Sequence, residues 1–121
     1  MPKKSNEAKY EFDTQSVVRA IVPLIVLEVL NDEEENGLYA AKILKRTETR
    51  INSLGEGFFN DVNKFELYSS VVYPMLGYMK NDQNKWIEVG ANSFYKITRL
   101  GKEKMTDWRK LFRLLAEVEN D

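Results

Sequence analysis

The apolar residues of the chain recur with the spacing of helices over most of its length. From Val17 to Leu30 almost no polar face remains, which is typical of a helix that protein surrounds on all sides. Pro23 interrupts this stretch, because a proline inside a helix removes a backbone hydrogen bond and bends the chain. Either Pro23 occupies the first turn of a helix that ends at Leu30, or it kinks a longer helix that begins near Thr14. We favour two helical pieces that meet at this point.

The middle of the chain begins with an acidic turn at 31–37, after which apolar residues from Leu38 to Leu44 predict a second amphipathic helix. The bases on its exposed side are Lys42, Lys45 and Arg46. The segment 51–67 is ambiguous, since two glycines break it while its phenylalanines have helical spacing. This segment is predicted to form a short amphipathic helix or a packed loop.

A third helix is predicted from about Ser70 to Asn81. Val72, Leu76 and Met79 share one face of this helix, which we assign to the core. Pro74 is acceptable only near the start of the helix, where backbone N–H groups have no helical partner.

A β-hairpin and a last helix complete the pattern. The segments Trp-Ile-Glu-Val at 86–89 and Phe-Tyr-Lys-Ile at 94–97 are predicted to be paired strands, and the residues at 90–93, Gly-Ala-Asn-Ser, suit the turn between them. The last helix is predicted to begin at Thr98 or Arg99. Its apolar stripe contains Met105, Trp108, Leu111, Phe112 and Leu115. A stripe of this length needs more cover than a small domain offers, so these five residues are predicted to form a dimer interface.

Helix, hairpin and helix in this order predict a mainly α fold with a small β-hairpin. The arrangement is that of a winged helix-turn-helix with an N-terminal helical extension and a long C-terminal dimerisation helix. The 121 residues have room for one compact domain. Within it we expect a flexible arm at 1–13, a winged-helix DNA-binding region at 14–98 and the dimerisation helix at 99–121.

Cysteine and histidine are both absent from the chain. Their absence excludes disulfides, thiolate nucleophiles, the usual zinc sites and histidine-dependent catalysis, so we expect no enzyme, no cofactor and no metal. The longest apolar stretch contains charged residues and is shorter than the roughly 20 residues that a spanning helix needs. Because the N-terminal residues also lack the pattern of a signal peptide, we expect a cytoplasmic protein without a membrane segment.

The net charge of −1 argues mildly against nucleic-acid binding, but the charges are unevenly distributed along the chain. Bases predominate at 41–50 and 94–113, and acids at 32–35 and 117–121. This distribution predicts a basic face on a slightly acidic molecule. The alternative is that these charges are solvated on ordinary helix surfaces.

Three segments resemble the PadR family of winged-helix transcriptional regulators. The run from Asn36 to Leu44 resembles the second helix of the family, although a leucine intervenes before Tyr39. Val-Val-Tyr-Pro-Met-Leu at 71–76 resembles the start of the family's recognition helix. Phe-Tyr-Lys-Ile-Thr-Arg-Leu-Gly at 94–101 resembles the aromatic-Tyr-x-Leu-Thr-x-x-Gly sequence at the end of the family's wing. The resemblance covers roughly residues 23–118.

The chain departs from the family pattern at two places. The segment between the second and third predicted helices is longer than the family's usual connection. The hairpin tip lacks the arginines and lysines that are common in the family's wing. These departures move the expected phosphate contacts toward the second helix or the longer segment.

At the start of the third helix, Ser69, Ser70 and Tyr73 are candidates for contact with DNA phosphates and base edges. The alternative is that a serine only caps the helix while Tyr73 packs on the core. No Asn, Gln or Arg lies early in this helix, so direct reading of bases is expected to be sparse and shape readout becomes important.

Further phosphate contacts are predicted for the second helix and the wing. The candidates are Lys42, Lys45, Arg46, Asn92 and Lys96. Trp108 has two interpretations: it belongs to the dimer core, or it stacks on a flat aromatic effector as the resemblance implies.

Together, the residues and the resemblance predict a homodimeric transcriptional repressor that binds a palindromic operator in double-stranded DNA. One alternative keeps the fold but assigns it to DNA segregation or architecture in a plasmid or virus. A second alternative is a winged helix that contacts another protein, which the low net charge and the uncharged hairpin tip favour.

Overall fold

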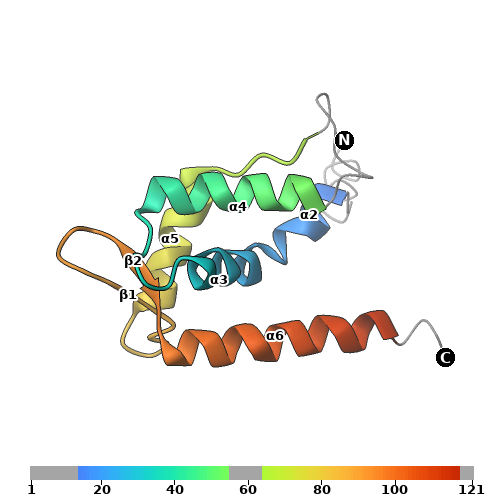
Figure 1. Cartoon of the computed structure of the whole chain (residues 1–121). Coiled ribbons are helices and arrows are strands. Elements are labelled where there is room, and N and C mark those ends of the chain that lie inside the picture. Colours follow the sequence, from blue (N-terminus) through green and yellow to red (C-terminus); the bar gives the residue numbers. More distant parts are fainter. Residues whose placement is uncertain (1–13, 55–63, 118–121) are drawn as a thin grey trace, which may run out of the picture.

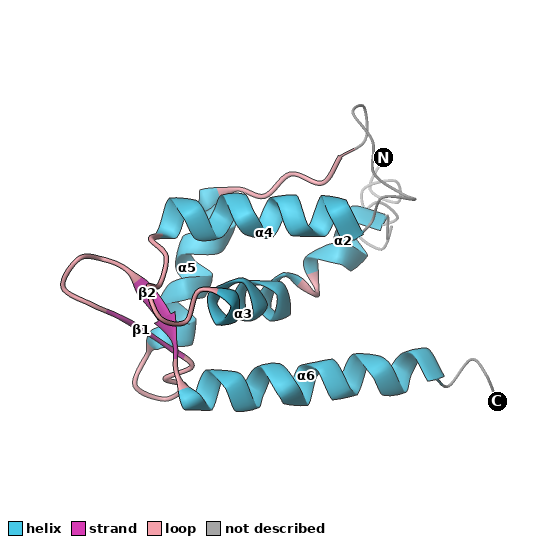
Figure 2. Cartoon of the chain, viewed as in Figure 1, coloured by secondary structure: helices cyan, strands magenta, loops and turns pink. Residues whose placement is uncertain are grey.

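The computed structural model describes residues 14–54 and 64–117, and the chain is mainly helical with one small antiparallel sheet (Figure 1, Figure 2). The elements are α2 (Thr14–Arg19), α3 (Val22–Asp32), α4 (Ala40–Leu54), α5 (Ser69–Lys80), β1 (Ile87–Val89), β2 (Tyr95–Ile97) and α6 (Arg99–Glu117). The prediction of a mainly α fold with a hairpin is therefore confirmed. The expected arm at 1–13 lies outside the described residues.

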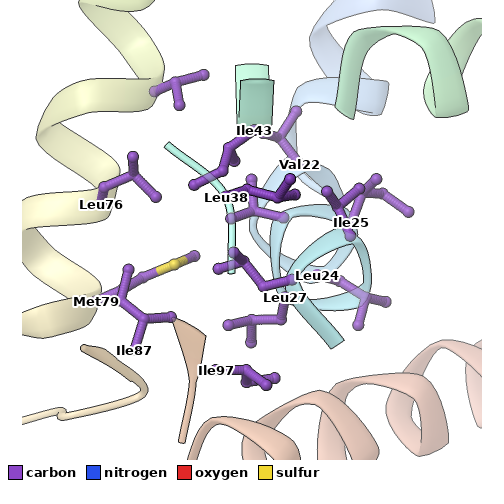
Figure 3. Packing of buried hydrophobic residues seen from close by; sticks show 14 of the residues in the cluster. Val22, Leu24, Ile25, Leu27, Leu38, Ile43, Leu76, Met79, Ile87 and Ile97 are labelled. Carbon is purple, nitrogen blue, oxygen red and sulfur yellow. The ribbon is translucent and has the colours of Figure 1, made fainter. Parts of the chain in front are cut away.

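Helix α3 is the centre of the molecule. It lies between α4 and α6 in Figure 1 and packs against both. The chain forms two helical pieces here, as predicted, because α2 ends at Arg19 and Pro23 occupies the first turn of α3. Seven of the eleven residues of α3 are buried, which explains the absence of a polar face in the sequence. Figure 3 shows Val22, Ile25 and Leu27 among the core side chains.

Helix α4 is longer than the sequence pattern indicates. It continues from Ala40 to Leu54 because Ile43, Thr47 and Ile51 extend one buried face over three turns. Beyond α4, the described chain resumes at Lys64 without helical structure, and the Asn52 side chain holds this return segment. Its amide donates to the Phe65 carbonyl at 2.9 Å and its oxygen accepts from the Phe65 N–H at 2.8 Å.

For the ambiguous segment 51–67, the described ends are the last turn of α4 and a packed, non-helical segment in which Phe65 is fully buried. Residues 55–63 lie outside the described residues. The N–H of Leu67, just before α5, donates to Glu48 on α4 at 2.9 Å. The beginning of α5 is therefore fixed beside the middle of α4.

Helix α5 buries the predicted face, Val72, Leu76 and Met79, against the core. Figure 3 shows Leu76 and Met79 of this face among the core side chains. The hairpin that follows also matches the prediction, with Ile87 opposite Ile97 and Val89 opposite Tyr95.

On its other edge, β2 pairs with the segment between α3 and α4. Tyr95 donates to the Leu38 carbonyl at 2.7 Å and accepts from the Leu38 N–H at 2.9 Å. This approach requires glycine at 37, which has φ +76° and leaves only 2.7 Å between an added Cβ and the Tyr95 carbonyl oxygen.

Helix α6 begins with a side-chain cap, since Thr98 Oγ1 accepts from the Gly101 N–H at 3.1 Å. Its first half packs on α3, and the Arg109 side chain bonds Glu28 of α3 at 2.6 Å. From Arg109 to Glu117 every residue is exposed. Among the described residues, no helix has both the length and the hydrophobicity to cross a membrane.

Candidate nucleic-acid interface

The candidate interface is the outer α5 face, which comprises Ser69, Ser70, Val71, Tyr73 and Pro74. All five residues are exposed, whereas Val72 between them is fully buried. The face spans the first two turns of α5 and carries no charged side chain. It is therefore a rigid and accessible surface, because one side of the same two turns is fixed in the core.

The serines do not cap α5. The N-cap is Tyr68, in extended conformation at φ −111° and ψ 149°, and it makes no side-chain capping bond. Its hydroxyl instead donates to the Glu66 carboxylate at 2.6 Å, and this bond, together with the negative charge of Glu66, raises the pKa of Tyr68. The alternative that a serine serves as the cap is wrong, so both hydroxyls stay exposed in the first turn.

The alternative that Tyr73 packs on the core is also wrong. Its side chain is 47% exposed, so it does not pack in the core. Pro74 is the sixth residue of α5, which is deeper in the helix than the pattern predicts. Because proline has no N–H, it cannot donate to the Ser70 carbonyl as the fourth residue along a helix normally does.

On α4, the three candidate basic residues, Lys42, Lys45 and Arg46, differ in their ion pairing. Lys42 and Lys45 are exposed and form no ion pair among the described residues. Arg46 is paired with Glu33 at 2.9 Å. Lys45 lies one turn before Glu48, the residue that holds the segment leading into α5. Lys42 and Lys45 are thus the available cations on this part of α4, whereas the charge of Arg46 is already compensated.

The hairpin candidates lie together but offer little net charge. Asn92 and Lys96 line one open hollow of about 430 Å³ with Asn36 and Glu88. Glu88 is directly opposite Lys96 in the strand pairing, so a carboxylate accompanies this ammonium group. The hairpin therefore presents mainly amide and backbone groups.

The expectation of acids and bases on separate faces is wrong for much of the chain. The acidic residues at the end of α3 and in the turn after it pair with basic residues of two helices: Asp32 with Arg50, Glu33 with Arg46, and Glu34 with Lys102. Sequence separation concealed these pairs, because the partners are 13 to 68 positions apart and meet only in the fold.

The predicted interface residues of α6 divide into two groups. Met105 is only 5% exposed and belongs to the core of its own chain, so its assignment to a dimer interface is corrected. Trp108 is half-buried, with its ring 5.4 Å from that of Trp86 at an angle of 84°. Leu111, Phe112 and Leu115 are exposed.

A groove of about 150 Å³ lies beside Trp108, and its walls come from α3, α6 and the turn before α3. The groove is lined by Ala20, Pro23, Leu24, Trp108, Leu111 and Phe112. Whether a flat aromatic molecule or a second subunit fills this groove stays a prediction.

The sequence did not identify Val71 and Trp86 as candidate residues, but the structure places Val71 on the outer α5 face and Trp86 between two helices. Val71 is apolar and therefore resembles a core residue, although its place next to Val72 turns it away from the buried stripe of α5. Trp86 links two elements, because its ring contacts both Tyr78 of α5 and Trp108 of α6. Only the tertiary structure reveals that Trp86 joins these two helices.

Within the described part of the chain, no group of three acidic side chains is placed to hold a metal ion. The resemblance to PadR regulators rests on the residues quoted above. No protein-family model matches the chain, and no curated protein or solved structure is similar enough to count as a match.

Proposed function

We propose that the chain is a homodimeric, PadR-like winged-helix regulator, a cytoplasmic repressor that binds a palindromic operator in double-stranded DNA. The observation that carries the proposal is the exposure of the outer α5 face on a helix whose other side is fixed in the core. In the proposed fold, α5 is the recognition helix that enters the major groove, and the β1–β2 hairpin is the wing.

The pairing of β2 with Leu38 supports this assignment. It gives the hairpin a third extended segment, located between α3 and α4. The resulting order is helix, extended segment, two helices and hairpin, which is the order of a winged helix. The hairpin is thereby attached next to the N-terminal end of α4.

In the proposed complex, the α5 N-terminus approaches the DNA backbone. The hydroxyls of Ser69 and Ser70 and the adjacent backbone N–H groups would bond phosphate oxygens. Lys42 and Lys45 would neutralise neighbouring phosphates, and Asn92 and Lys96 would approach the backbone from the wing. Because the outer α5 face itself carries no charged side chain, we expect affinity to depend on close fit more than on charge.

The homodimer would form through the exposed half of α6. Leu111, Phe112 and Leu115 lie close to one another on this helix, and the described residues of their own chain leave them 50%, 37% and 58% exposed. A contiguous apolar surface of this kind marks an interface. A twofold dimer would then present two copies of α5 to half-sites about one helical turn of DNA apart.

The test is a fluorescence-polarisation titration of the full chain with duplexes from the region upstream of its own gene. We expect Ser70→Asp to weaken binding at least about tenfold, because a carboxylate would face the phosphates. The same substitution favours the start of a helix, so lost binding would not reflect a melted α5. Gln83→Glu adds equal charge at an exposed turn beyond α5 and is expected to change little.

Absence of binding by the unmodified chain at low salt would contradict the proposal. A stable complex with a protein, formed without any affinity for DNA, would instead favour the interaction module considered from the sequence.

A further inference from the structure

The outer α5 face lacks the side chains that usually identify guanine, adenine and cytosine. Guanine is read by Arg or Lys, adenine by Asn or Gln, and cytosine by Asp or Glu. None of these six residue types occurs from Ser69 to Met79. A helix that enters the major groove with this face must therefore use apolar contacts, hydroxyls or its backbone.

The apolar part of the face is compact. Val71 is 39% exposed, and Pro74 follows it by three positions, so the two side chains are neighbours on the helix surface. Val72, buried at the same turn, fixes the backbone that carries Val71. Val71 is β-branched and has little rotational freedom. These features give a small, stiff hydrocarbon surface beside Ser70, which lies one turn before Pro74.

In the major groove, the one apolar group on a base edge is the 5-methyl group of thymine. We propose that Val71, with Pro74 beside it, reads thymine methyl groups, so that each operator half-site carries T·A pairs where α5 enters. This inference rests on the proposed function and names the class of sequence that it recognises.

The backbone of α5 supports the same choice of base pair. Because Pro74 has no N–H, the carbonyl of Ser70 lacks its usual helical donor on the exposed side of the second turn. The adenine of a T·A pair presents an N6 amino donor in the major groove, next to the thymine methyl group. One T·A pair therefore supplies both a methyl group for Val71 and an amino donor for the Ser70 carbonyl.

A protein surface is the other partner that an apolar patch can accept. The surroundings favour DNA, because two exposed serines precede the patch on α5. Lys42 and Lys45, which form no ion pair among the described residues, lie on the helix that contacts α5. A hydrocarbon contact with hydroxyls beside it and cations on the neighbouring helix matches a thymine within a phosphate backbone.

The experiment uses a duplex that the full chain selects from a random pool at low salt. Each thymine of this duplex is replaced in turn by deoxyuridine, which removes only the methyl group. At the contacted positions we expect binding to weaken about fourfold, the factor for one buried methyl group. With Val71→Ala the same replacements are expected to have little further effect, which defines a double-mutant cycle. Replacing cytosine by 5-methylcytosine in a poorly bound duplex is the reverse control.

The outcomes separate the two proposals. If the chain binds the selected duplex but no deoxyuridine replacement weakens binding, DNA binding stands and thymine reading is overturned. If deoxyuridine replacement weakens DNA binding by the Val71→Ala variant as much as binding by the unmodified chain, Val71 does not contact the methyl group and the inference also fails. If no duplex is selected, both proposals fall, and capture of a defined protein by the outer α5 face would then explain the patch.

Discussion

Thr47 places a hydroxyl among aliphatic side chains in the core. It is fully buried on α4 between Ile43 and Ile51, and its Oγ1 has no hydrogen-bond partner among the described residues. An unpaired buried hydroxyl lowers the free energy of unfolding, because it is hydrated in the unfolded chain and has no partner in the folded one. Thr47→Val keeps the shape and is expected to raise the free energy of unfolding by about 1 kcal/mol.

Urea unfolding at one protein concentration measures this change. Thr49→Val makes the same replacement at an exposed position of the same helix, so it controls for helix propensity and is expected to be nearly neutral. A lower unfolding midpoint for Thr47→Val would mean that the hydroxyl is bonded in solution.

Residues whose role is local could be predicted from the sequence, and residues whose role is tertiary could not. The cap at Thr98 is a local signal, in line with the prediction that the last helix begins at Thr98 or Arg99. Gly101 was noted only as part of a motif. In the structure an added Cβ at this position would lie 2.0 Å from the Trp86 carbonyl oxygen. That close approach joins α6 to the start of the hairpin, and no local pattern encodes it.

Among the elements, α4 shows most clearly what the sequence pattern could not predict. The stripe of Ile43, Thr47 and Ile51 includes a polar residue, and this concealed the continuation of the helix to Leu54. The charges of α4 were equally ambiguous. Lys42, Lys45 and Arg46 look alike in sequence, yet Glu33 from the preceding turn reaches only Arg46. Periodicity therefore identified the helix, and tertiary pairing decided which bases remain available.

Lys42 and Lys45 carry a quantitative prediction for the proposed DNA complex. Each phosphate that a lysine neutralises adds about 0.9 to the slope of log affinity against log salt. The double substitution of both lysines by alanine should weaken binding to all sequences and reduce this slope by nearly two. Salt titrations by fluorescence polarisation measure it. Arg113→Ala removes one exposed charge on α6, away from the proposed interface, and is the control. A slope that matches this control would place α4 outside the interface.

For the molecule as a whole, the described residues of the chain cover only the first part of the long apolar stripe of α6. Met105 and the ring of Trp108 pack on their own chain, while Leu111, Phe112 and Leu115 extend beyond it. Sequence periodicity therefore predicted a buried face but could not show where the cover by α3 ends. The described core fixes that boundary near Trp108.

The exposed half of α6 makes the oligomeric state testable without disturbing the fold. Leu111 and Leu115 are 50% and 58% exposed, so replacing both by glutamine should leave the single chain folded. If α6 pairs with a second copy, each dimer loses four leucine contacts, and the dimer dissociation constant should rise at least about a hundredfold. Sedimentation of the full chain over a range of concentrations measures this constant.

Leu54→Gln is the matched control for this experiment, because Leu54 is exposed at the end of α4 and lies off the α6 stripe. A monomeric double variant that still binds half of the operator with reduced affinity would connect α6 to the spacing of the two α5 helices. If the double variant remains as dimeric as the control, another surface joins the subunits, and the twofold placement of α5 on a palindrome would have to be derived from that surface.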